Sequence, residues 1–370
     1  MKVDFLDVKA GYIELKPQID AAIKGILESG WYVLGSEVDL FEKEYAKYCE
    51  SEHCVGVGNG LDALHLGLLA LGVGPGDEVI VPSNTYIATW LAVSQCGAKP
   101  VPVEPDINTF NIAPSSISDA ITKKTKVIIP VHLYGQSADL DPILEIAKNH
   151  GLKVLEDAAQ VHGGRYKGRR IGSHGDLVAW SFYPGKNLGA YGDGGAITTD
   201  NAELAEKIRV LRNYGSKIKY VNEIRGLNSR LDPLQAAVLR VKLNYLDEWN
   251  SRRSAIAKTY QTELDSSNIV LPYSLDFIDP VWHLFVILVE DRDSVQKKLA
   301  NMGVGTILHY PIPPHRQKAY SDENYLADQF PIASKISDEC ISLPIGPHLD
   351  DKKVSFVIEA MNKILKDKLI

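Results

Sequence analysis

The stretch TKVIIPVHLYGQSADLDPILEIAKNHGLKVLED, residues 125–157, contains the pattern that decides the fold. Two short apolar runs rich in β-branched residues, 125–133 and 152–157, predict strands, and the amphipathic segment 138–149 between them predicts a helix. Near-continuous apolar strands separated by helices are typical of a parallel sheet that is buried on both faces.

The same alternation continues toward the N-terminus. Short apolar runs alternate with helical patterns, and we expect strands at 54–60, 77–82 and 99–104 and helices at 16–29 and 36–49. The sequence therefore predicts an α/β fold, with a mainly parallel sheet sandwiched by helices.

The pattern changes in the last third of the chain. A long helix is expected from Asp232-Pro233 to residue 264. It is followed by VWHLFVILVE, a helix near 293–301, GTILHY and a terminal helix near 349–366. We therefore expect a large domain at 1–245 and a smaller α+β domain at 246–370.

Composition excludes several classes of protein. The chain has 370 residues, 45% of them hydrophobic, and a net charge of −7, which argues against non-specific binding of nucleic acid or anionic membranes. Its four cysteines lack zinc or CxxC spacing, so we expect reduced thiols in a cytoplasmic protein and no metal site. The sequence shows neither a signal core nor an apolar run of about 18 residues.

One lysine stands in an unusual setting, in the stretch SFYPGKNLGAYGDGG at 181–195. Small and turn-forming residues surround Lys186, so a tight pocket formed largely by backbone is expected around its amine. A phosphate loop is excluded, because that motif needs a glycine where Trp180 stands and a serine or threonine where Asn187 stands.

Ligands of parallel sheets bind at the carboxyl ends of the strands, and three such ends have suggestive residues. The turn at Gly60 opens a helix whose N–H groups could hold a phosphate, although Leu61 breaks the dinucleotide fingerprint and a plain turn is an equal alternative. Tyr86 follows another strand and could equally be an ordinary core aromatic. Glu156 and Asp157 end a third, where a surface turn is the simpler interpretation.

Together these features predict a site for pyridoxal 5′-phosphate. A lysine can form the covalent link to its aldehyde, and a carboxylate can keep its ring nitrogen protonated. An aromatic ring can cover the cofactor, and a helix N-terminus can bind its phosphate.

Long motifs also carry a family resemblance. They include SGWYVLGSEVDLFEKEYAKYC, GNGLDALHL, DEVIVPSNTYIAT, EDAAQVHGGRYKGRRIGSHGD, SFYPGKNLGAYGDGG and GLNSRLDPLQAAVL. By these motifs, which cover nearly the whole chain, the sequence resembles the DegT/DnrJ group of nucleotide-sugar aminotransferases. The resemblance implies the fold-type I aminotransferase architecture, pyridoxal phosphate as cofactor and L-glutamate as amino donor.

The resemblance also implies roles for single residues. Lys186 matches the lysine that binds the cofactor covalently and moves the proton, and Asp157 and Gln160 match the partners of the ring nitrogen and the phenolic oxygen. Tyr86 matches the residue that covers the ring. The phosphate contacts are expected from Gly60, Leu61 and Ser181, and from Asn228 of the neighbouring subunit in a homodimer with shared active sites. Many relatives have serine or threonine in place of Leu61, so only backbone contacts are expected there. For Asn228, an alternative is that it and Arg230 cap the helix that begins near Asp232.

Substrate-binding residues are expected to be basic or hydroxylic, since nucleotide sugars contain a diphosphate. The candidates are Tyr183, Lys217, Lys219, Tyr220, His309, Tyr310 and His315. For the two lysines a solvated surface loop is an equal alternative. His162 is left open between a structural and a site-lining residue.

The residues of these motifs are most similar to those of enzymes that aminate dTDP-3-keto-6-deoxyhexoses at carbon 3, to give dTDP-3-amino-3,6-dideoxyhexoses. Amination at carbon 4 is an alternative, as is a non-catalytic cofactor-binding regulator. A sugar dehydratase of this fold has histidine in place of Lys186 and is excluded. The gluco or galacto configuration of the sugar stays open.

Overall fold

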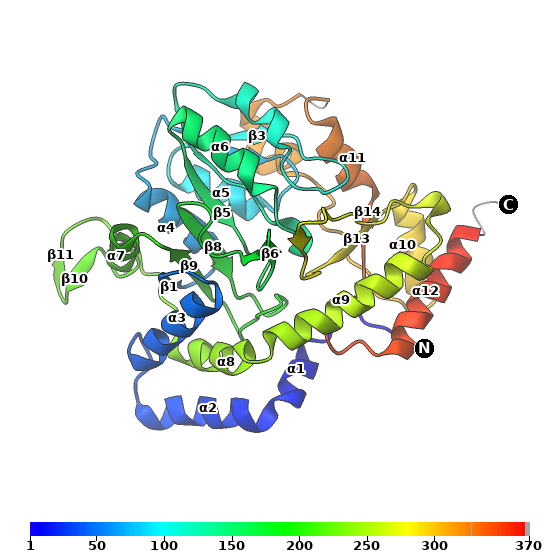
Figure 1. Cartoon of the computed structure of the whole chain (residues 1–370), viewed down its shortest axis with the longest axis horizontal. Coiled ribbons are helices and arrows are strands. Elements are labelled where there is room, and N and C mark those ends of the chain that lie inside the picture. The colour runs from blue at the N-terminus through cyan, green and yellow to red at the C-terminus, as the bar shows by residue number, and fades with distance from the viewer. Residues whose placement is uncertain (327, 367–370) are drawn as a thin grey trace.

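The computed structural model describes residues 1–326 and 328–366 (Figure 1). Its centre is a seven-stranded sheet with the order β1-β9-β8-β5-β4-β2-β3. The strands are β1 (His53–Val57), β2 (Glu78–Pro82), β3 (Lys99–Val103), β4 (Thr125–Ile128), β5 (Lys153–Asp157), β8 (Leu177–Ser181) and β9 (Gly195–Thr199). Strand β9 runs antiparallel to both of its neighbours, and the other pairs are parallel.

Strand β8 shows how the sheet is buried on both faces. Leu177 and Ala179 enter one core cluster, whereas Val178 and Trp180 enter another. The first cluster is completed by α4 (Gly60–Ala70), α5 (Ile87–Gln95) and α7 (Ala202–Leu211), and the opposite face is covered by α3 (Ser36–Tyr48), α6 (Leu140–His150) and α8 (Pro233–Leu243). The predicted α/β sandwich is therefore confirmed.

Two more helices precede the sheet. They are α1 (Val8–Glu14) and α2 (Lys16–Ser29), and α2 packs along α8 (Figure 1). Helix α2 ends where the sequence predicts, at Gly30, whose φ of 68° is a left-handed conformation that glycine adopts without strain.

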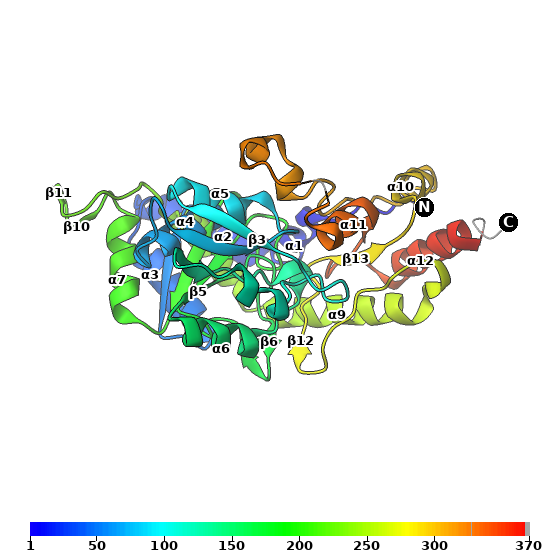
Figure 2. The ribbon, with the colours of Figure 1, turned by 90° about the horizontal axis from the view of Figure 1, so that it is seen from above.

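The C-terminal part has a core of its own, in which Tyr260, Phe285 and Met361 are buried. It is built from α9 (Leu246–Glu263), β13 (Phe285–Leu288), α10 (Arg292–Asn301), α11 (Pro331–Glu339), β14 (Cys340–Leu343) and α12 (Asp351–Lys366), with β13 antiparallel to β14 (Figure 2). Val3 enters the same core and pairs with Val304. The boundary at 245/246 stays a prediction.

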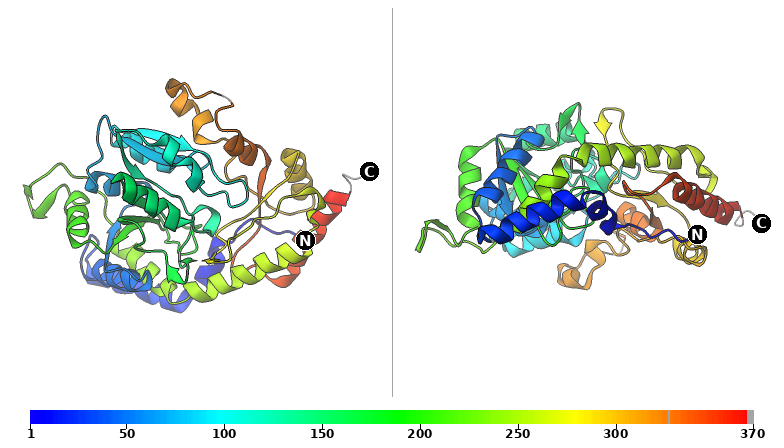
Figure 3. Two further views of the ribbon diagram at one scale, coloured as in Figure 1. Left: turned by 45° about the horizontal axis from the view of Figure 1, so that its top comes forward. Right: turned by 90° about the horizontal axis from the view of Figure 1, so that it is seen from below.

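Two small sheets lie outside these cores. One joins β6 (Arg165–Tyr166), β7 (Arg169–Arg170) and β12 (Ile278–Asp279). The other is the hairpin of β10 (Ser216–Ile218) and β11 (Val221–Asn222), which projects from the molecule at the end opposite α12 (Figures 1 and 3).

One sequence prediction was wrong in detail. The expected long helix from 232 to 264 is divided into α8 and α9 at Asn244 and Tyr245. The segment GTILHY contributes the isolated bridge between Ile307 and Ser342.

A buried ion pair connects β1 to the helix layers. Arg212 donates to the Glu42 carboxylate and to the Gly56 carbonyl, and Glu42 in turn accepts the Gly56 N–H group at 2.8 Å. Both charged side chains are buried, so each compensates the charge of the other in the absence of water.

We expect Arg212→Met to lower the free energy of unfolding by about 3–5 kcal/mol, because it leaves the Glu42 carboxylate buried without its cation. Arg209→Met, on the same helix but partly exposed, is the control and should cost no more than about 1 kcal/mol. Urea unfolding followed by circular dichroism measures both. Equal midpoints for the two variants would contradict the importance of the buried pair.

Candidate active site

Strands β1, β2, β5 and β8 run in the same direction, so their carboxyl ends lie at the same edge of the sheet. Within that edge β5 and β8 are direct neighbours, and β1 lies beyond β9. Each of these ends leads into a turn with predicted site residues. The turn after β1 enters α4, whose first turn is capped by the Asn59 side chain, which accepts the Asp62 N–H at 2.8 Å.

Gly60 and Ser181 lie against each other at this edge. A Cβ atom placed on Gly60 would lie 2.6 Å from the Cβ of Ser181, so the close approach requires glycine. The Leu61 side chain packs on the core of the sheet, which leaves its backbone to face the turn. A helix N-terminus beside a serine hydroxyl has the donors that a phosphate needs.

Asp157 is buried at the end of β5. Its carboxylate accepts hydrogen bonds from the Thr89 hydroxyl at 2.9 Å and from the Ala159 N–H at 3.2 Å. Burial raises the pKa of the Asp157 carboxyl, and these bonds and the nearby Lys186 charge offset part of the rise. A buried carboxylate of this kind is suited to a cationic partner.

The adjacent Glu156 faces the other side of the strand. Its carboxylate accepts from His132 Nε2 at 2.9 Å and from the Gly175 N–H at 2.6 Å. Burial is the largest single influence and would raise the pKa of Glu156, but the hydrogen bonds from His132 and Gly175 and the nearby histidine charges together place the pKa below its ordinary value. Of the two strand-end acids, Asp157 therefore belongs to the site and Glu156 to the packing behind it.

Lys186 lies in the turn after β8, where its N–H donates to the Tyr183 carbonyl at 2.8 Å. Burial lowers the pKa of the Lys186 amine to about 8, although the Asp157 carboxylate acts in the opposite direction. The glycine-rich stretch that follows is held by Lys242, whose amine donates to the Gly189 carbonyl at 2.6 Å.

Gln160, in the segment after β5, joins that segment to the C-terminal part of the chain. Its Oε1 accepts the Tyr134 N–H at 2.8 Å, and its Nε2 donates to the Tyr310 hydroxyl at 3.2 Å. The Tyr310 ring lies 5.2 Å from that of Tyr86, measured between centroids. His309 is held by Ser342 at 2.8 Å, and burial, aided by the Lys186 charge, lowers its pKa to about 4.

The remaining candidates within one chain differ in exposure. Tyr183 is 61% exposed beside Lys186. His315 is buried with its ring 4.9 Å from that of Phe330, and its contact with a substrate stays a prediction. His162 is buried between Trp180 and Phe182, and burial, aided by the nearby Lys186 charge, lowers its pKa to about 3.

The other candidates lie between residues 217 and 228, and the last of them, Asn228, adjoins Ser229, whose hydroxyl accepts the Gly58 N–H at 2.9 Å beside the Gly60 turn. Lys217, Lys219 and Tyr220 belong to the projecting hairpin, and Tyr220 is 87% exposed. Asn228 is exposed and pairs with Asn213, whose side chain also accepts from Arg230 at 2.9 Å. Helix α8 receives no side-chain cap, so the capping alternative for Asn228 finds no support.

Sequence reasoning missed several residues around Lys186 and Asp157. Thr89 stands one turn after Tyr86 on α5, so helical spacing could have placed it near the strand ends. Asn250 and His283 come from distant segments, and no local signal connects them with the site.

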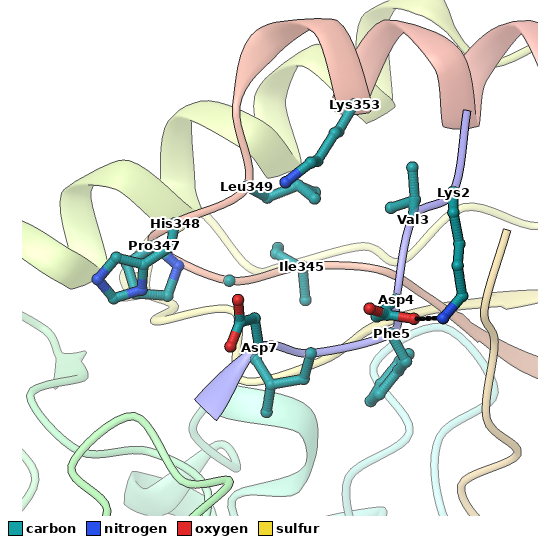
Figure 4. Close-up of a pocket in the computed structure, with 12 residues that line it drawn as sticks. Lys2, Val3, Asp4, Phe5, Asp7, Ile345, Pro347, His348, Leu349 and Lys353 are labelled. Carbon is teal, nitrogen blue, oxygen red and sulfur yellow. Dashed lines mark ion pairs between the residues drawn. The ribbon is translucent and has the colours of Figure 1, made fainter. Parts of the chain in front are cut away.

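Other features of the molecule lie apart from this region. Figure 4 shows a cavity of about 80 Å³ between the N-terminal segment and the loop before α12, lined among others by Lys2, Phe5, His348 and Lys353. None of the candidate residues lines it. Within residues 1–326 and 328–366 no helix is both long and apolar enough to cross a membrane. The described side chains also form no cluster of three or more His, Cys, Asp or Glu suited to a metal ion.

The residues present fit pyridoxal phosphate. The Gly60 turn is a cradle that an added Cβ would fill, with helix N–H groups and the Ser181 hydroxyl as donors. A buried acid, Asp157, and an amine of lowered pKa, Lys186, lie close enough to influence each other's titration. This set can bind a phosphate, hold a cationic ring nitrogen and attack an aldehyde.

Comparison with known proteins agrees with this chemistry. The chain is 55% identical to "Erythromycin biosynthesis sensory transduction protein EryC1" of Saccharopolyspora erythraea, over 98% of this chain and 99% of the relative. It is 54% identical to the dTDP-3-amino-3,6-dideoxy-alpha-D-galactopyranose transaminase of Aneurinibacillus thermoaerophilus, with the same coverage. The crystal structure of S. venezuelae DesV in complex with a ketimine intermediate matches with a TM-score of 0.97 and 52% identity, over 98% of both chains.

The family comparison covers nearly the whole sequence, since residues 14–362 match the DegT/DnrJ/EryC1/StrS aminotransferase family. The predicted fold-type I architecture and the predicted cofactor are both confirmed by these relatives. The chain therefore belongs to the DegT/DnrJ/EryC1/StrS family of pyridoxal-phosphate-dependent aminotransferases.

Proposed function

We propose that the protein transfers the amino group of L-glutamate to carbon 3 of a dTDP-linked 3-keto-6-deoxyhexose, giving a dTDP-3-amino-3,6-dideoxyhexose. The observation that carries this proposal is that Lys186 and Asp157 follow the ends of the neighbouring parallel strands β8 and β5, close enough for the Asp157 charge to influence the Lys186 amine. The sugar and its carbon are supported by the Aneurinibacillus transaminase, which shares 54% of its residues with this chain.

Lys186 and Asp157 carry the chemical steps. Bound pyridoxal phosphate supplies an aldehyde that takes up the amino group and a ring that accepts electrons. Lys186 holds the cofactor and, once released, moves the proton at the substrate carbon, for which its lowered pKa of about 8 suits it near neutral pH. Asp157 keeps a proton on the ring nitrogen by a charge-assisted hydrogen bond.

The remaining cofactor contacts orient the ring. The N–H groups of Gly60 and Leu61 and the Ser181 hydroxyl bind the phosphate. Gln160, whose amide donates to Tyr310, holds the phenolic oxygen when the cofactor is bound. Tyr86, more than half exposed, covers the ring face.

The sugar is expected to enter on the open side of the site. Tyr183 is exposed there, and His309 and Tyr310 approach from the C-terminal part of the chain. His309 is neutral at pH 7 because its pKa is lowered to about 4, so it can accept as well as donate a hydrogen bond to a sugar hydroxyl. His315 acts indirectly, through packing against Phe330.

The nucleotide is expected to be bound with help from a second copy of the chain. Lys217, Lys219 and Tyr220 lie on the projecting hairpin, and Asn228 at its base adjoins Ser229, whose hydroxyl accepts the Gly58 N–H beside the Gly60 turn. Ile218 and Tyr220 are 67% and 87% exposed, which is unusual for apolar side chains on a projecting hairpin. A homodimer with reciprocal exchange of these residues explains this exposure.

The cytoplasm is the proposed location. All four cysteines, Cys49, Cys54, Cys96 and Cys340, are buried free thiols, which suits a reducing compartment.

Two alternatives are tested by the same experiment. One is amination at carbon 4. The other is a regulator without catalysis, since the Saccharopolyspora relative is named a sensory transduction protein, but the complete set of Lys186, Asp157 and Gln160 disfavours this alternative.

We expect the purified protein with L-glutamate to convert a dTDP-3-keto-6-deoxyhexose to the 3-amino sugar, identified by nuclear magnetic resonance. Lys186→Ala should abolish conversion, since it removes the amine that holds the cofactor covalently. Amination of a 4-keto sugar instead would contradict the proposed carbon. Near wild-type turnover by Lys186→Ala would contradict the proposed mechanism.

Asp157→Asn should lower kcat by about 100-fold or more, because a neutral amide cannot stabilise the proton on the ring nitrogen. Stopped-flow absorbance of the half-reaction with L-glutamate measures this loss. Asp119→Asn, an exposed carboxylate between β3 and β4, is the control and should leave the rate unchanged. An unchanged rate in Asp157→Asn would assign the role to another acid.

Mixing of two inactive variants tests the shared site. Lys186→Ala subunits and Asn228→Asp subunits are combined after reversible dissociation, so that half of the dimers become heterodimers. Each heterodimer has one intact site, and about a quarter of the wild-type activity should return. Heterodimers demonstrated by mass without any recovered activity would remove the shared-site proposal.

A further inference from the structure

Asn187, the residue after Lys186, has an unusually complete set of buried contacts. Its Nδ2 donates to Asn250 Oδ1 at 2.9 Å and to the Val281 carbonyl at 2.9 Å. Its Oδ1 accepts from His283 Nδ1 at 3.2 Å. The side chain is 5% exposed, so it makes these bonds without competition from water.

Asn250 extends the same network to a fourth segment. It lies buried on α9 and donates through Nδ2 to the His162 carbonyl at 2.9 Å, beyond the end of β5. One turn further along α9, Arg253 donates to the carbonyls of Trp282 and His283 at 3.2 and 3.3 Å. The turn that contains Lys186 is thereby fixed to α9, to residues 281–283 and to the segment after β5.

We propose that Asn187 and Asn250 are positioning residues, which hold the Lys186 turn against α9 and so keep the Lys186 amine in its water-poor place opposite Asp157. This inference rests on the proposed role of Lys186. Neither asparagine touches the amine, so their effect passes through the backbone of the turn. The lysine side chain itself is long and flexible, and a fixed backbone is what limits where its amine can be.

The network has a consequence for the titration of Lys186. The groups that interact electrostatically with its amine are Asp157, His162, His283 and His309. Burial is the larger influence and lowers the pKa of Lys186 to about 8, whereas the Asp157 charge raises it. A loosened turn admits water to the amine, removes part of the burial effect and therefore raises the pKa toward its ordinary value.

The experiment uses Asn187→Ala, Asn250→Ala and the double variant. Ser251→Ala is the matched control, since Ser251 is the exposed neighbour of Asn250 on the same helix. The full chain, freed of cofactor, is labelled with trinitrobenzenesulfonate over a range of pH, and the rate at the Lys186 peptide is followed by mass spectrometry. The Lys207 peptide is an internal reference, because the Lys207 amine donates to the Ala70 carbonyl at 2.8 Å, away from the turn that Asn187 holds.

We expect the labelling midpoint of Lys186 to rise by about one pH unit in each single variant, while the labelling of Lys207 stays unchanged. In the holoenzyme kcat should fall by about tenfold with little change in KM for L-glutamate, because a misplaced amine affects the proton transfer more than substrate binding. The double variant should resemble the single ones, since both changes break the same connection.

Unchanged Lys186 midpoints and unchanged kcat would overturn the inference, even if the melting temperature fell, because the network would then be only structural. Additive effects in the double variant would also overturn it. If the alanine variants do not fold, Asn187→Ser and Asn250→Ser give the same comparison with smaller changes. A failure of the proposed function would show up differently, as activity that persists in Lys186→Ala. The labelling midpoints are measured on protein without cofactor and do not depend on that activity.

Discussion

The electrostatic pairing of Asp157 with Lys186 is the constraint on which the site depends. Burial opposes charge on both groups, and each favours the charged form of the other. The pairing is possible because β5 and β8 are parallel neighbours that end at the same edge of the sheet. Every other feature of the site either holds one of these two groups or supplies the surfaces around a cofactor placed between them.

Asp157 and the Lys186 turn are each held in place by hydrogen bonds from neighbouring residues. Asp157 is oriented by Thr89 on α5, while the adjacent Glu156 and His132 fill the opposite side of the strand with a satisfied polar pair. The Lys186 turn is held by Asn187. The two supports differ in origin, since one belongs to the sheet and its helices, and the other reaches α9 and the C-terminal part of the chain.

The sequence predicted most of this architecture because buried parallel strands are recognisable as apolar runs. Strands β2, β3 and β5 were found in this way, and the strand-end rule then located Gly60, Tyr86 and Asp157. The reversal of β9 and the break between α8 and α9 were not predictable, because both depend on packing between distant segments. The same reason explains why Asn250 and His283 were missed.

The pairing of Val3 with the segment around Val304 has a consequence for synthesis. Val3 donates to the Gly303 carbonyl and accepts from the Gly305 N–H, both at 2.8 Å, and its side chain is buried in the C-terminal core. Roughly 300 residues separate the two segments, so at ribosomal speeds of about 5–20 residues per second the N-terminal segment waits about 15–60 s for its partner. During that interval the central sheet can assemble, while the segment around Val3 stays unpaired and available to other binders such as chaperones.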